Sequence, residues 1–233
     1  MKNMNFQNLI PKISDNMEQD LVPSTETINK EEHLAQFNKP NSYYGFEENE
    51  YIPKLEDYKP QLQTTNAGKK EAQLMKDTVQ KWLDSKNGWL TIIGGVGIGK
   101  THLMKAITKL GNCYYLTAYE FDYRIKKFRN SYDTNENFVD PDDWVQNIGT
   151  MERRLILDDI GAGYIDKGWT TKRFERLIDL RYRNQRPTAL TSNLSGKELE
   201  KELGDRIISR ITDVNISRVL LCTNTKDLRL KRR

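Results

Sequence analysis

The sequence predicts an α/β fold in which helices flank a five-stranded parallel sheet. The first observation is a set of five short apolar runs, at residues 89–94, 113–118, 154–159, 188–193 and 218–222. The second is that helical or polar stretches separate these runs, as expected when parallel strands alternate with helices. The third is a glycine-rich turn directly after the first run, where a helix N-terminus can bind an anion.

Composition and charge bound the protein class. The chain has 233 residues, of which 36% are hydrophobic and 30% are charged, which suits one globular domain with some polar extra length. Cys113 and Cys222 lie far apart and beside apolar residues, so we expect two reduced thiols in a cytosolic protein. No stretch approaches the roughly 18 apolar residues of a membrane span, and the N-terminus lacks a signal peptide's apolar run. We therefore expect a cytoplasmic protein without a membrane partner.

Charge divides the chain into two parts. Residues 1–60 hold 6 Lys+Arg and 11 Asp+Glu, whereas residues 61–233 hold 31 and 22. We interpret residues 1–60 as an acidic, weakly ordered arm and linker, and residues 61–233 as the folded domain. An acidic arm on a basic body indicates two kinds of partner, with a polyanion for the body. The alternatives are association of the arm with the body, or no specific role for either charge.

The first helix of the domain begins near Lys70. Apolar side chains then recur at helical spacing: Ala72, Met75, Val79, Trp82 and Leu83. Asn87 and Gly88 are expected to stop this helix before the first strand.

The glycine-rich turn after the first strand reads GGVGIGKTHL and satisfies the pattern G-x-x-x-x-G-K-[ST]. Its glycines let backbone N–H groups surround a β-phosphate, Lys100 reaches the β- and γ-phosphates, and the Thr101 hydroxyl binds Mg²⁺. A chance glycine-rich turn is the weaker interpretation, because the motif lies between a strand and a helix. The expected nucleotide-binding residues are Gly94, Gly95, Val96, Gly97, Ile98, Gly99, Lys100, Thr101 and His102, the last as a packing or hydrogen-bonding neighbour.

The third strand ends in two adjacent carboxylates, in the stretch LILDDIG. We expect Asp158 to hold the Mg²⁺ shell, since a divalent cation makes paired carboxylates tolerable. Asp159 is expected to orient or polarise the attacking water. The competing interpretation for Asp159 is that it caps the turn into Ile160 and Gly161.

The fourth strand ends in TSN, and ligands bind at the carboxyl ends of parallel strands. Asn193 is therefore expected to hold the water or the γ-phosphate, unless it is a simple turn residue. Two helices should follow: Ser195 and Glu198 form a capping box and Gly204 ends the first helix, while Asp205 caps the second.

Two arginines share one face of this last helix, because Arg206 and Arg210 are four residues apart. One of them could reach the γ-phosphate of a neighbouring subunit and act as an arginine finger. The alternative is a solvated or salt-bridged pair.

Four stretches in this order carry a family resemblance: GGVGIGKTHL, LILDDIG, RYRNQRPTALTSNLS and GDRIISRI. Over roughly residues 70–233 the chain resembles the AAA+ ATPases of the DnaC/DnaI helicase-loader group, to which the transposition ATPase IstB is related. The resemblance implies an AAA+ core, ATP with Mg²⁺, side-by-side homo-oligomers, single-stranded DNA binding and delivery of a replicative ring helicase. We expect slow hydrolysis between subunits, because Asp159 is one methylene shorter than Glu and would reach the attacking water poorly.

The resemblance also assigns individual residues. Lys100 and Thr101 match the Walker A positions, and Asp158 and Asp159 match Walker B. Asn193 matches sensor I. The arginine-finger box contains both Arg206 and Arg210, without a choice between them.

The chain departs from larger relatives in two ways. Only about 40 residues follow Asn193, so we expect no C-terminal helical lid. Residues 1–60 contain no Cys and only His33, so we expect no zinc cluster such as some loaders carry. The helicase-binding role of the arm is carried over by position alone.

The stretch AYEFDYRIKKFRNSY, between the second and third strands, is a candidate DNA-contacting helix. One face is an apolar stripe expected in the core: Phe121, Ile125 and Phe128. The opposite face carries the candidate DNA contacts: Tyr123, Arg124, Lys126 and Lys127. An exposed Tyr among cations suits single-stranded DNA, although an ordinary solvated basic face has the same pattern. In DnaC-like and DnaA-like proteins this insertion is the initiator-specific segment. The tail at residues 228–233 either adds phosphate contacts or frays.

Two other functions remain open at this point. An IstB-like transposition regulator would use the same ATPase core to bind a transposase and duplex DNA. A small-molecule P-loop kinase would need a lid over its acceptor pocket. The missing lid, the TSN stretch and the arginine pair argue against the kinase.

Overall fold

A computed structural model describes residues 40–85, 88–130, 139–161 and 168–229. Five strands form one sheet in the order β2-β3-β4-β1-β5, and each neighbouring pair is parallel. The strands are β1 Trp89–Gly94, β2 Tyr114–Thr117, β3 Leu155–Asp158, β4 Thr188–Ser192 and β5 Ser217–Cys222. The predicted five-stranded parallel sheet is therefore confirmed.

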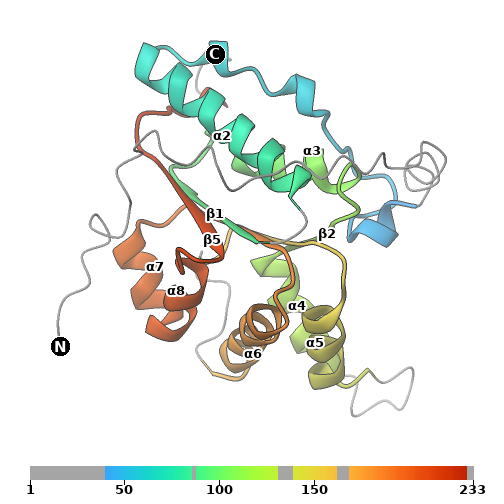
Figure 1. Cartoon of the computed structure of the whole chain (residues 1–233). Coiled ribbons are helices and arrows are strands. Elements are labelled where there is room, and N and C mark those ends of the chain that lie inside the picture. Colours follow the sequence, from blue (N-terminus) through green and yellow to red (C-terminus); the bar gives the residue numbers. More distant parts are fainter. Residues whose placement is uncertain (1–39, 86–87, 131–138, 162–167, 230–233) are drawn as a thin grey trace.

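Helices cover both faces of the sheet (Figure 1). One layer consists of α2 Asn66–Asp84 and α3 Lys100–Thr108. The other layer consists of α4 Ala118–Asn130, α5 Pro141–Thr150, α6 Trp169–Arg183, α7 Gly196–Leu203 and α8 Asp205–Ile211. Short 3₁₀ turns precede α2: η2 Asn41–Tyr44, η3 Leu55–Asp57 and η4 Pro60–Leu62. No helix of the described residues is long and apolar enough to cross a membrane.

Each strand serves both layers of the core, because successive side chains of a strand point to opposite faces. In β1, Leu90 and Ile92 pack in the α2 and α3 layer. Trp89 and Ile93 pack in the layer of α4 to α8. This double burial explains why the strands read as nearly continuous apolar runs.

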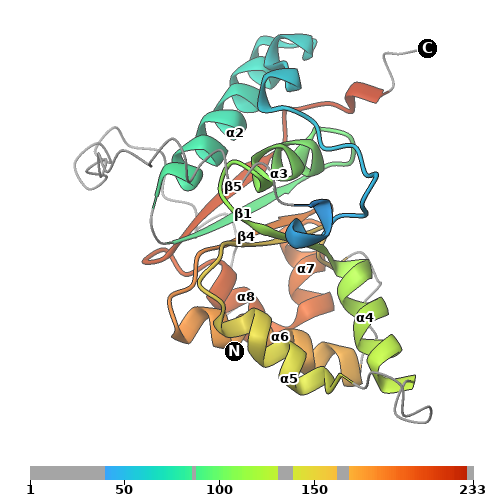
Figure 2. The same cartoon turned by 90° about the vertical axis from the view of Figure 1, so that its right-hand side faces the viewer.

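The segment before α2 packs on the core. Tyr44, Phe46 and Tyr58 are each less than 5% exposed and belong to the α2 and α3 layer. Figure 2 shows this segment and the segment that follows β5 on the same side of the sheet as α2 and α3. The expected arm at 1–60 therefore contains a packed part, whereas its first 39 residues lie outside the described part of the chain. The boundary at residue 60 stays a prediction.

The helix ends agree with the sequence predictions except at two places, the start of α2 and the N-cap of α8. Helix α2 begins at Asn66 rather than near Lys70, because the Thr65 side chain accepts a hydrogen bond from the Gly68 N–H at 2.9 Å. The predicted capping box of α7 is confirmed at its Ser195 N-cap. The predicted cap of α8 by Asp205 is wrong: Asp205 is the first residue of the helix, and Gly204, with φ +80°, occupies the cap position.

A buried arginine joins three elements beneath the sheet. Arg181 is fully buried and donates to Thr188 Oγ1 at 2.7 Å and to the carbonyls of Ile148, Arg153 and Pro187 at 2.8 to 2.9 Å. Burial lowers its pKa to about 9, so the guanidinium stays charged at neutral pH. These bonds hold the end of α5, the start of β3 and the start of β4 around α6, and thereby fix the strands whose other ends form the site.

Candidate functional site

The loop between β1 and α3 surrounds a buried ammonium group. Lys100 is 5% exposed, and its Nζ donates to the carbonyls of Gly94 and Gly95 at 2.6 and 2.8 Å and to Asn193 Oδ1 at 2.7 Å. Burial lowers the pKa of Lys100, while the nearby charges of Asp158 and Asp159 oppose this shift. A cation whose bonded partners are all neutral oxygens can exchange them for an anion.

Two glycines of this loop have conformations that favour glycine. Gly97 has φ +76° and Gly99 has φ +100°. A Cβ on Gly99 would lie 2.4 Å from the ring of Tyr58. The Tyr58 hydroxyl also donates to the Ile98 carbonyl at 3.1 Å. Tyr58 therefore supports the loop, a role missed because the residue lies in the segment interpreted as a linker.

The remaining loop residues differ in exposure. Val96 is 55% exposed at the tip of the loop, and Thr101 is exposed in the first turn of α3. The His102 ring packs 6.0 Å from the Tyr58 ring, between centroids, and its Nε2 has no hydrogen-bond partner among the described residues. These placements leave Thr101 open to solvent at the helix N-terminus and make His102 a packing neighbour.

The first carboxylate of LILDDIG is held from two sides. Asp158, at the end of β3, is 1% exposed. Its Oδ2 accepts from the Tyr115 hydroxyl at 2.6 Å, and its Oδ1 accepts from Thr191 Oγ1 at 2.5 Å. Burial, together with Asp158, raises the pKa of Tyr115, so this hydroxyl stays protonated and remains a donor. Two neutral donors thus stabilise a buried carboxylate, and the charge of the Lys100 ammonium lies nearby.

The second carboxylate points elsewhere because its backbone turns. Asp159 has φ +59°, a left-handed conformation that Asp adopts more readily than Glu. Its N–H donates to Thr191 Oγ1 at 2.9 Å, and its Oδ1 accepts a short hydrogen bond from Asn193 Nδ2. Burial and the neighbouring Asp158 raise the pKa of Asp159. The turn at position 159 therefore gives a reason why Asp stands there rather than the longer Glu.

Asn193 connects the phosphate loop to the acidic pair. Its Oδ1 accepts from the Lys100 ammonium, and its Nδ2 donates to the Asp159 carboxylate. The amide can adopt only this orientation, because an ammonium donates and a carboxylate accepts. The structure therefore brings together three residues that lie far apart in the sequence, and we call Lys100, Asn193 and Asp159 the amide relay.

The two candidate finger residues lie in a different place. On α8, Arg206 pairs with Glu175 at 2.9 Å and with Asp179 at 2.5 Å, and Arg210 pairs with the same Asp179 at 2.5 Å. The structure joins both arginines to α6 rather than to the phosphate loop. The Arg206 side chain is 61% exposed and that of Arg210 is 22% exposed, so Arg206 is the freer of the two.

Helix α4 presents an aromatic pair to solvent. Tyr123 is 54% exposed and stacks on Tyr119, which is 57% exposed, with ring centroids 6.4 Å apart. The expected core stripe is buried at Phe121 and Ile125, and Phe128 packs on a neighbouring tryptophan of α5. Tyr119 was missed, although its position four residues before Tyr123 was the available signal.

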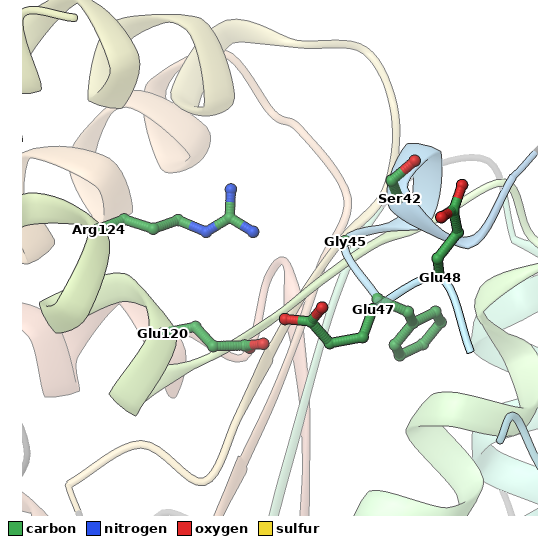
Figure 3. A pocket seen from close by; sticks show the side chains of 7 residues that line it. Ser42, Gly45, Glu47, Glu48, Glu120 and Arg124 are labelled. Carbon is green, nitrogen blue, oxygen red and sulfur yellow. The ribbon is translucent and has the colours of Figure 1, made fainter. Parts of the chain in front are cut away.

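The cations beside this pair differ in their surroundings. Lys126 forms an ion pair with Asp122 at 2.6 Å. Arg124 faces a surface pocket that the segment before α2 forms with α4, and the carboxylates of Glu47 and Glu120 point toward each other across it (Figure 3). These acidic groups reduce the attraction of Arg124 for a phosphate, whereas Lys127 is exposed on the helix.

The described residues contain no group of three or more His, Cys, Asp or Glu that could hold a metal ion on its own. Asp158 and Thr101 offer one carboxylate and one hydroxyl oxygen. Mg²⁺ suits this donor set, because it commonly takes one or two protein oxygens and completes its shell with phosphate and water.

No protein-family model matches the chain. Among curated proteins, the chromosomal replication initiator protein DnaA of Limosilactobacillus fermentum is 36% identical over 132 residues, which cover 52% of this chain and 27% of that protein. DnaA of Lacticaseibacillus casei is 34% identical over 128 residues, which cover 52% of this chain and 26% of that protein. The chain thus spans about a quarter of the length of the curated relatives it matches.

Three solved structures share the fold. The DnaC helicase loader has a TM-score of 0.56 at 20% identity, over 78% of this chain and 99% of that one. DnaI has a TM-score of 0.52 at 19% identity, over 82% and 94%. The replication initiator DnaA bound to AMPPCP and single-stranded DNA has a TM-score of 0.57 at 19% identity, over 78% and 55%. The resemblance to AAA+ helicase loaders is thereby confirmed in the fold, which this chain shares with DnaC, DnaI and DnaA.

Proposed function

We propose that this chain is an ATP-dependent helicase loader of DNA replication. The observation that carries the proposal is the amide relay, which ties the lysine of the phosphate loop to an acidic residue through one asparagine. The likeness to DnaC, DnaI and DnaA supports replication rather than transposition as the setting.

ATP binding would begin at Lys100. Its ammonium would leave the carbonyls of Gly94 and Gly95 and bind the β- and γ-phosphates, since a charged acceptor makes a stronger hydrogen bond than a neutral carbonyl. The loop N–H groups and the α3 N-terminus would hold the remaining phosphate oxygens. Thr101 and Asp158 would hold Mg²⁺, which supplies charge neutralisation for the phosphates.

The amide relay would then respond to the γ-phosphate. When Lys100 turns to the phosphates, Asn193 Oδ1 loses its ammonium partner and becomes free to accept from the attacking water. Asp159 would hold Asn193 through the amide Nδ2 and take up the water's proton. The raised pKa of Asp159 suits a carboxylate that must accept a proton, and a short, turned side chain is consistent with slow hydrolysis.

Hydrolysis would require a second subunit. The chain's own arginines Arg206 and Arg210 are held on α6, so a neighbouring copy would supply the finger. We assign Arg206 to this role because its side chain is the more exposed. Transfer of its guanidinium from Asp179 and Glu175 to a phosphate would couple assembly to ATP.

Single-stranded DNA would lie on α4. Tyr119 and Tyr123 would stack with bases, and Lys127 would contact a phosphate. Arg124 and Lys126 would contribute less, because acidic groups already surround them. The ring helicase would be held by the acidic arm that the sequence predicts at residues 1–60.

A pull-down tests this function. The full chain and a chain lacking residues 1–39 are each mixed with ATP and a cell extract, and captured proteins are identified by mass spectrometry. The truncation keeps residues 40–60, which include the Tyr44, Phe46 and Tyr58 side chains that pack on the core. We expect the full chain to recover a replicative ring helicase and the truncated chain to lose it. Recovery of a transposase instead would favour the IstB-like alternative.

A further inference from the structure

The segment that follows β5 passes over the phosphate loop. Strand β5 pairs with β1 so that Cys222 lies opposite Gly94, where the loop begins. Six residues later the Leu228 N–H donates to the Gly97 carbonyl at 3.1 Å. The chain therefore returns to the middle of the loop after it leaves the sheet.

This segment is anchored before it reaches the loop. The Glu71 carboxylate of α2 accepts hydrogen bonds from the backbone N–H groups of Thr223, Asn224 and Thr225 at 2.7 to 2.9 Å. Burial alone would raise the pKa of Glu71, but these bonds lower it overall, so the carboxylate stays charged. Thr225 is itself buried. The position of the residues that follow is thus set by α2.

A second anchor continues the first. Gln63 Nε2 donates to the Lys226 carbonyl at 3.0 Å, and Gln63 Oε1 accepts from the Lys226 N–H at 2.9 Å. Gln63 is 2% exposed. Four consecutive residues, 223–226, therefore have fixed partners on the way to the loop.

Asp227 rests directly on the loop. A Cβ added to Gly97 would lie 1.8 Å from Asp227 Oδ1, so the carboxylate occupies the space that any other residue at position 97 would fill. Its side chain is 24% exposed. A negative charge therefore stands beside the loop that would receive phosphates.

Arg229 is held by this carboxylate. Its Nη2 lies 3.1 Å from Asp227 Oδ2, its Nε lies 3.2 Å from Oδ1, and its N–H donates to the same Oδ1 at 2.9 Å. The side chain remains 67% exposed, and its charge acts on Lys100 across the loop. An exposed ion pair such as this one contributes little free energy, so the planar guanidinium can exchange the carboxylate for an acceptor that binds it more strongly.

We propose that Arg229 is a further phosphate-binding residue of the nucleotide site, and that Asp227 holds it beside the loop until nucleotide arrives. The inference rests on the proposed function, because it assigns the phosphates to the loop around Lys100. The nucleotide phosphates replace Asp227 as the partner of the guanidinium, since a phosphate accepts two parallel N–H bonds and carries more charge than a carboxylate.

The two residues have opposite effects on affinity. Arg229 attracts the phosphates, so its loss weakens binding. Asp227 repels them and competes for Arg229, so removal of its charge strengthens binding. A purely structural clasp over the loop would instead make both substitutions act in the same direction.

Equilibrium titration with a fluorescent ATP analogue tests the proposal on the full chain. We expect Arg229→Ala to weaken binding about tenfold, the loss expected for one hydrogen-bonded charge contact. Arg229→Lys should recover part of it. Asp227→Asn should tighten binding severalfold. Arg218→Ala, an exposed arginine at the opposite end of β5, should bind as the parent does.

The outcomes separate this inference from the proposed function. If the parent binds ATP, Lys100→Ala does not, and Arg229→Ala binds as the parent does, the role of Arg229 is wrong while the nucleotide site stands. If Asp227→Asn weakens binding as much as Arg229→Ala, Asp227 is an anchor and not a competitor, which overturns the exchange. If the parent itself does not bind ATP, the proposed function and this inference both fail.

Discussion

Two regions of the molecule differ in how their charged side chains are stabilised. One is the sheet edge beside the phosphate loop, which we call the loop edge and which contains Lys100 and Asp158. The other is the arginine pair of α8. At the loop edge, Lys100 and Asp158 are at most 5% exposed, and their partners come from three different strands. On α8, Arg206 is largely exposed and shares one carboxylate of α6 with Arg210. The buried charges lie where the ends of neighbouring strands meet, whereas the exposed arginines take the nearest carboxylate of their own chain. We propose that the exposed arginines exchange their carboxylate for a phosphate bound by a neighbouring copy, and that the buried charges form the site that binds this phosphate.

The largest expected effect on ATP turnover comes from loss of Arg206, and it tests whether the exposed arginines act differently from the buried charges. We expect Arg206→Ala to bind ATP normally but to lower turnover by about 10³-fold, as removal of an arginine finger does. Arg210→Ala should mainly lower the melting temperature, because Arg210 packs over the Tyr182 ring and is less exposed. Steady-state ATPase assays and thermal unfolding of both variants measure this difference.

Mixing two inactive variants shows whether the finger acts between subunits. Lys100→Ala lacks the nucleotide site but keeps Arg206, while Arg206→Ala keeps the site. An equal mixture should regain part of the parent's turnover. A mixture as inactive as its components would place the finger within one chain or remove it from the mechanism.

The next effect concerns the amide relay within the loop edge. Asn193→Ala should leave ATP affinity within a few fold and lower turnover by about 10²-fold, because the water loses its acceptor and Asp159 its donor. Asn193→Asp is the matched control: it keeps the size but places a second carboxylate against Asp159. Single-turnover hydrolysis measures both variants. Parent-like turnover of Asn193→Ala would remove the relay from the chemistry.

A smaller effect is expected on α4, where Tyr123 and Lys127 are exposed and lie outside the proposed nucleotide site. Tyr123→Ala combined with Lys127→Ala should weaken binding to a labelled oligo-dT about tenfold, since one stacked base and one phosphate contact are lost. Fluorescence anisotropy at two salt concentrations measures this. Lys126→Ala should change affinity little, because Asp122 already pairs with it. If both variants lost the same affinity for the oligonucleotide, α4 would bind DNA only through its general positive charge and not through Tyr123.

The smallest effect is on stability. Burial and Asp158 raise the pKa of Asp159, so the folded chain binds this proton more tightly than the unfolded chain, and ionisation of Asp159 lowers stability at neutral pH. Asp159→Asn should therefore raise the melting temperature by a few degrees at pH 7. The gain should vanish below about pH 4, where the carboxyl is protonated in both states. A lower melting temperature at pH 7 would mean that the ionised carboxylate stabilises the fold.

The sequence was sufficient for the residues that directly follow a strand. Asp158, Asp159 and Asn193 each stand where an apolar run ends, and Lys100 ends the glycine-rich turn that follows the first run. Parallel strands bring such ends to one edge. The strand bounds were right to within one residue for the same reason: both faces of the sheet are buried, so apolar runs mark the strands. Fold and loop edge could therefore be predicted together.

Other site residues carried no such signal. Tyr115 and Thr191 lie inside strands, where aromatic and β-branched residues are common, and only the sheet order shows that their hydroxyls meet Asp158. Tyr58 and Asp227 reach the loop because distant segments fold back onto it, a long-range event without a local pattern. The pairing of Arg206 with Asp179 depends on how α8 crosses α6, and spacing within one helix cannot give that.

Phosphate binding by the loop around Lys100 is the step on which every proposed activity of this chain depends. Titration of Lys100→Ala with a fluorescent ATP analogue tests it most directly, with Lys201→Ala, an exposed lysine of α7, as the matched control. We expect affinity to fall by about 100-fold or more in Lys100→Ala, since a buried ammonium makes charge-assisted bonds to the phosphates, and to stay at the parent value in Lys201→Ala. Parent-like affinity of a Lys100→Ala variant that circular dichroism shows to be folded would mean that this loop does not bind the phosphates of ATP.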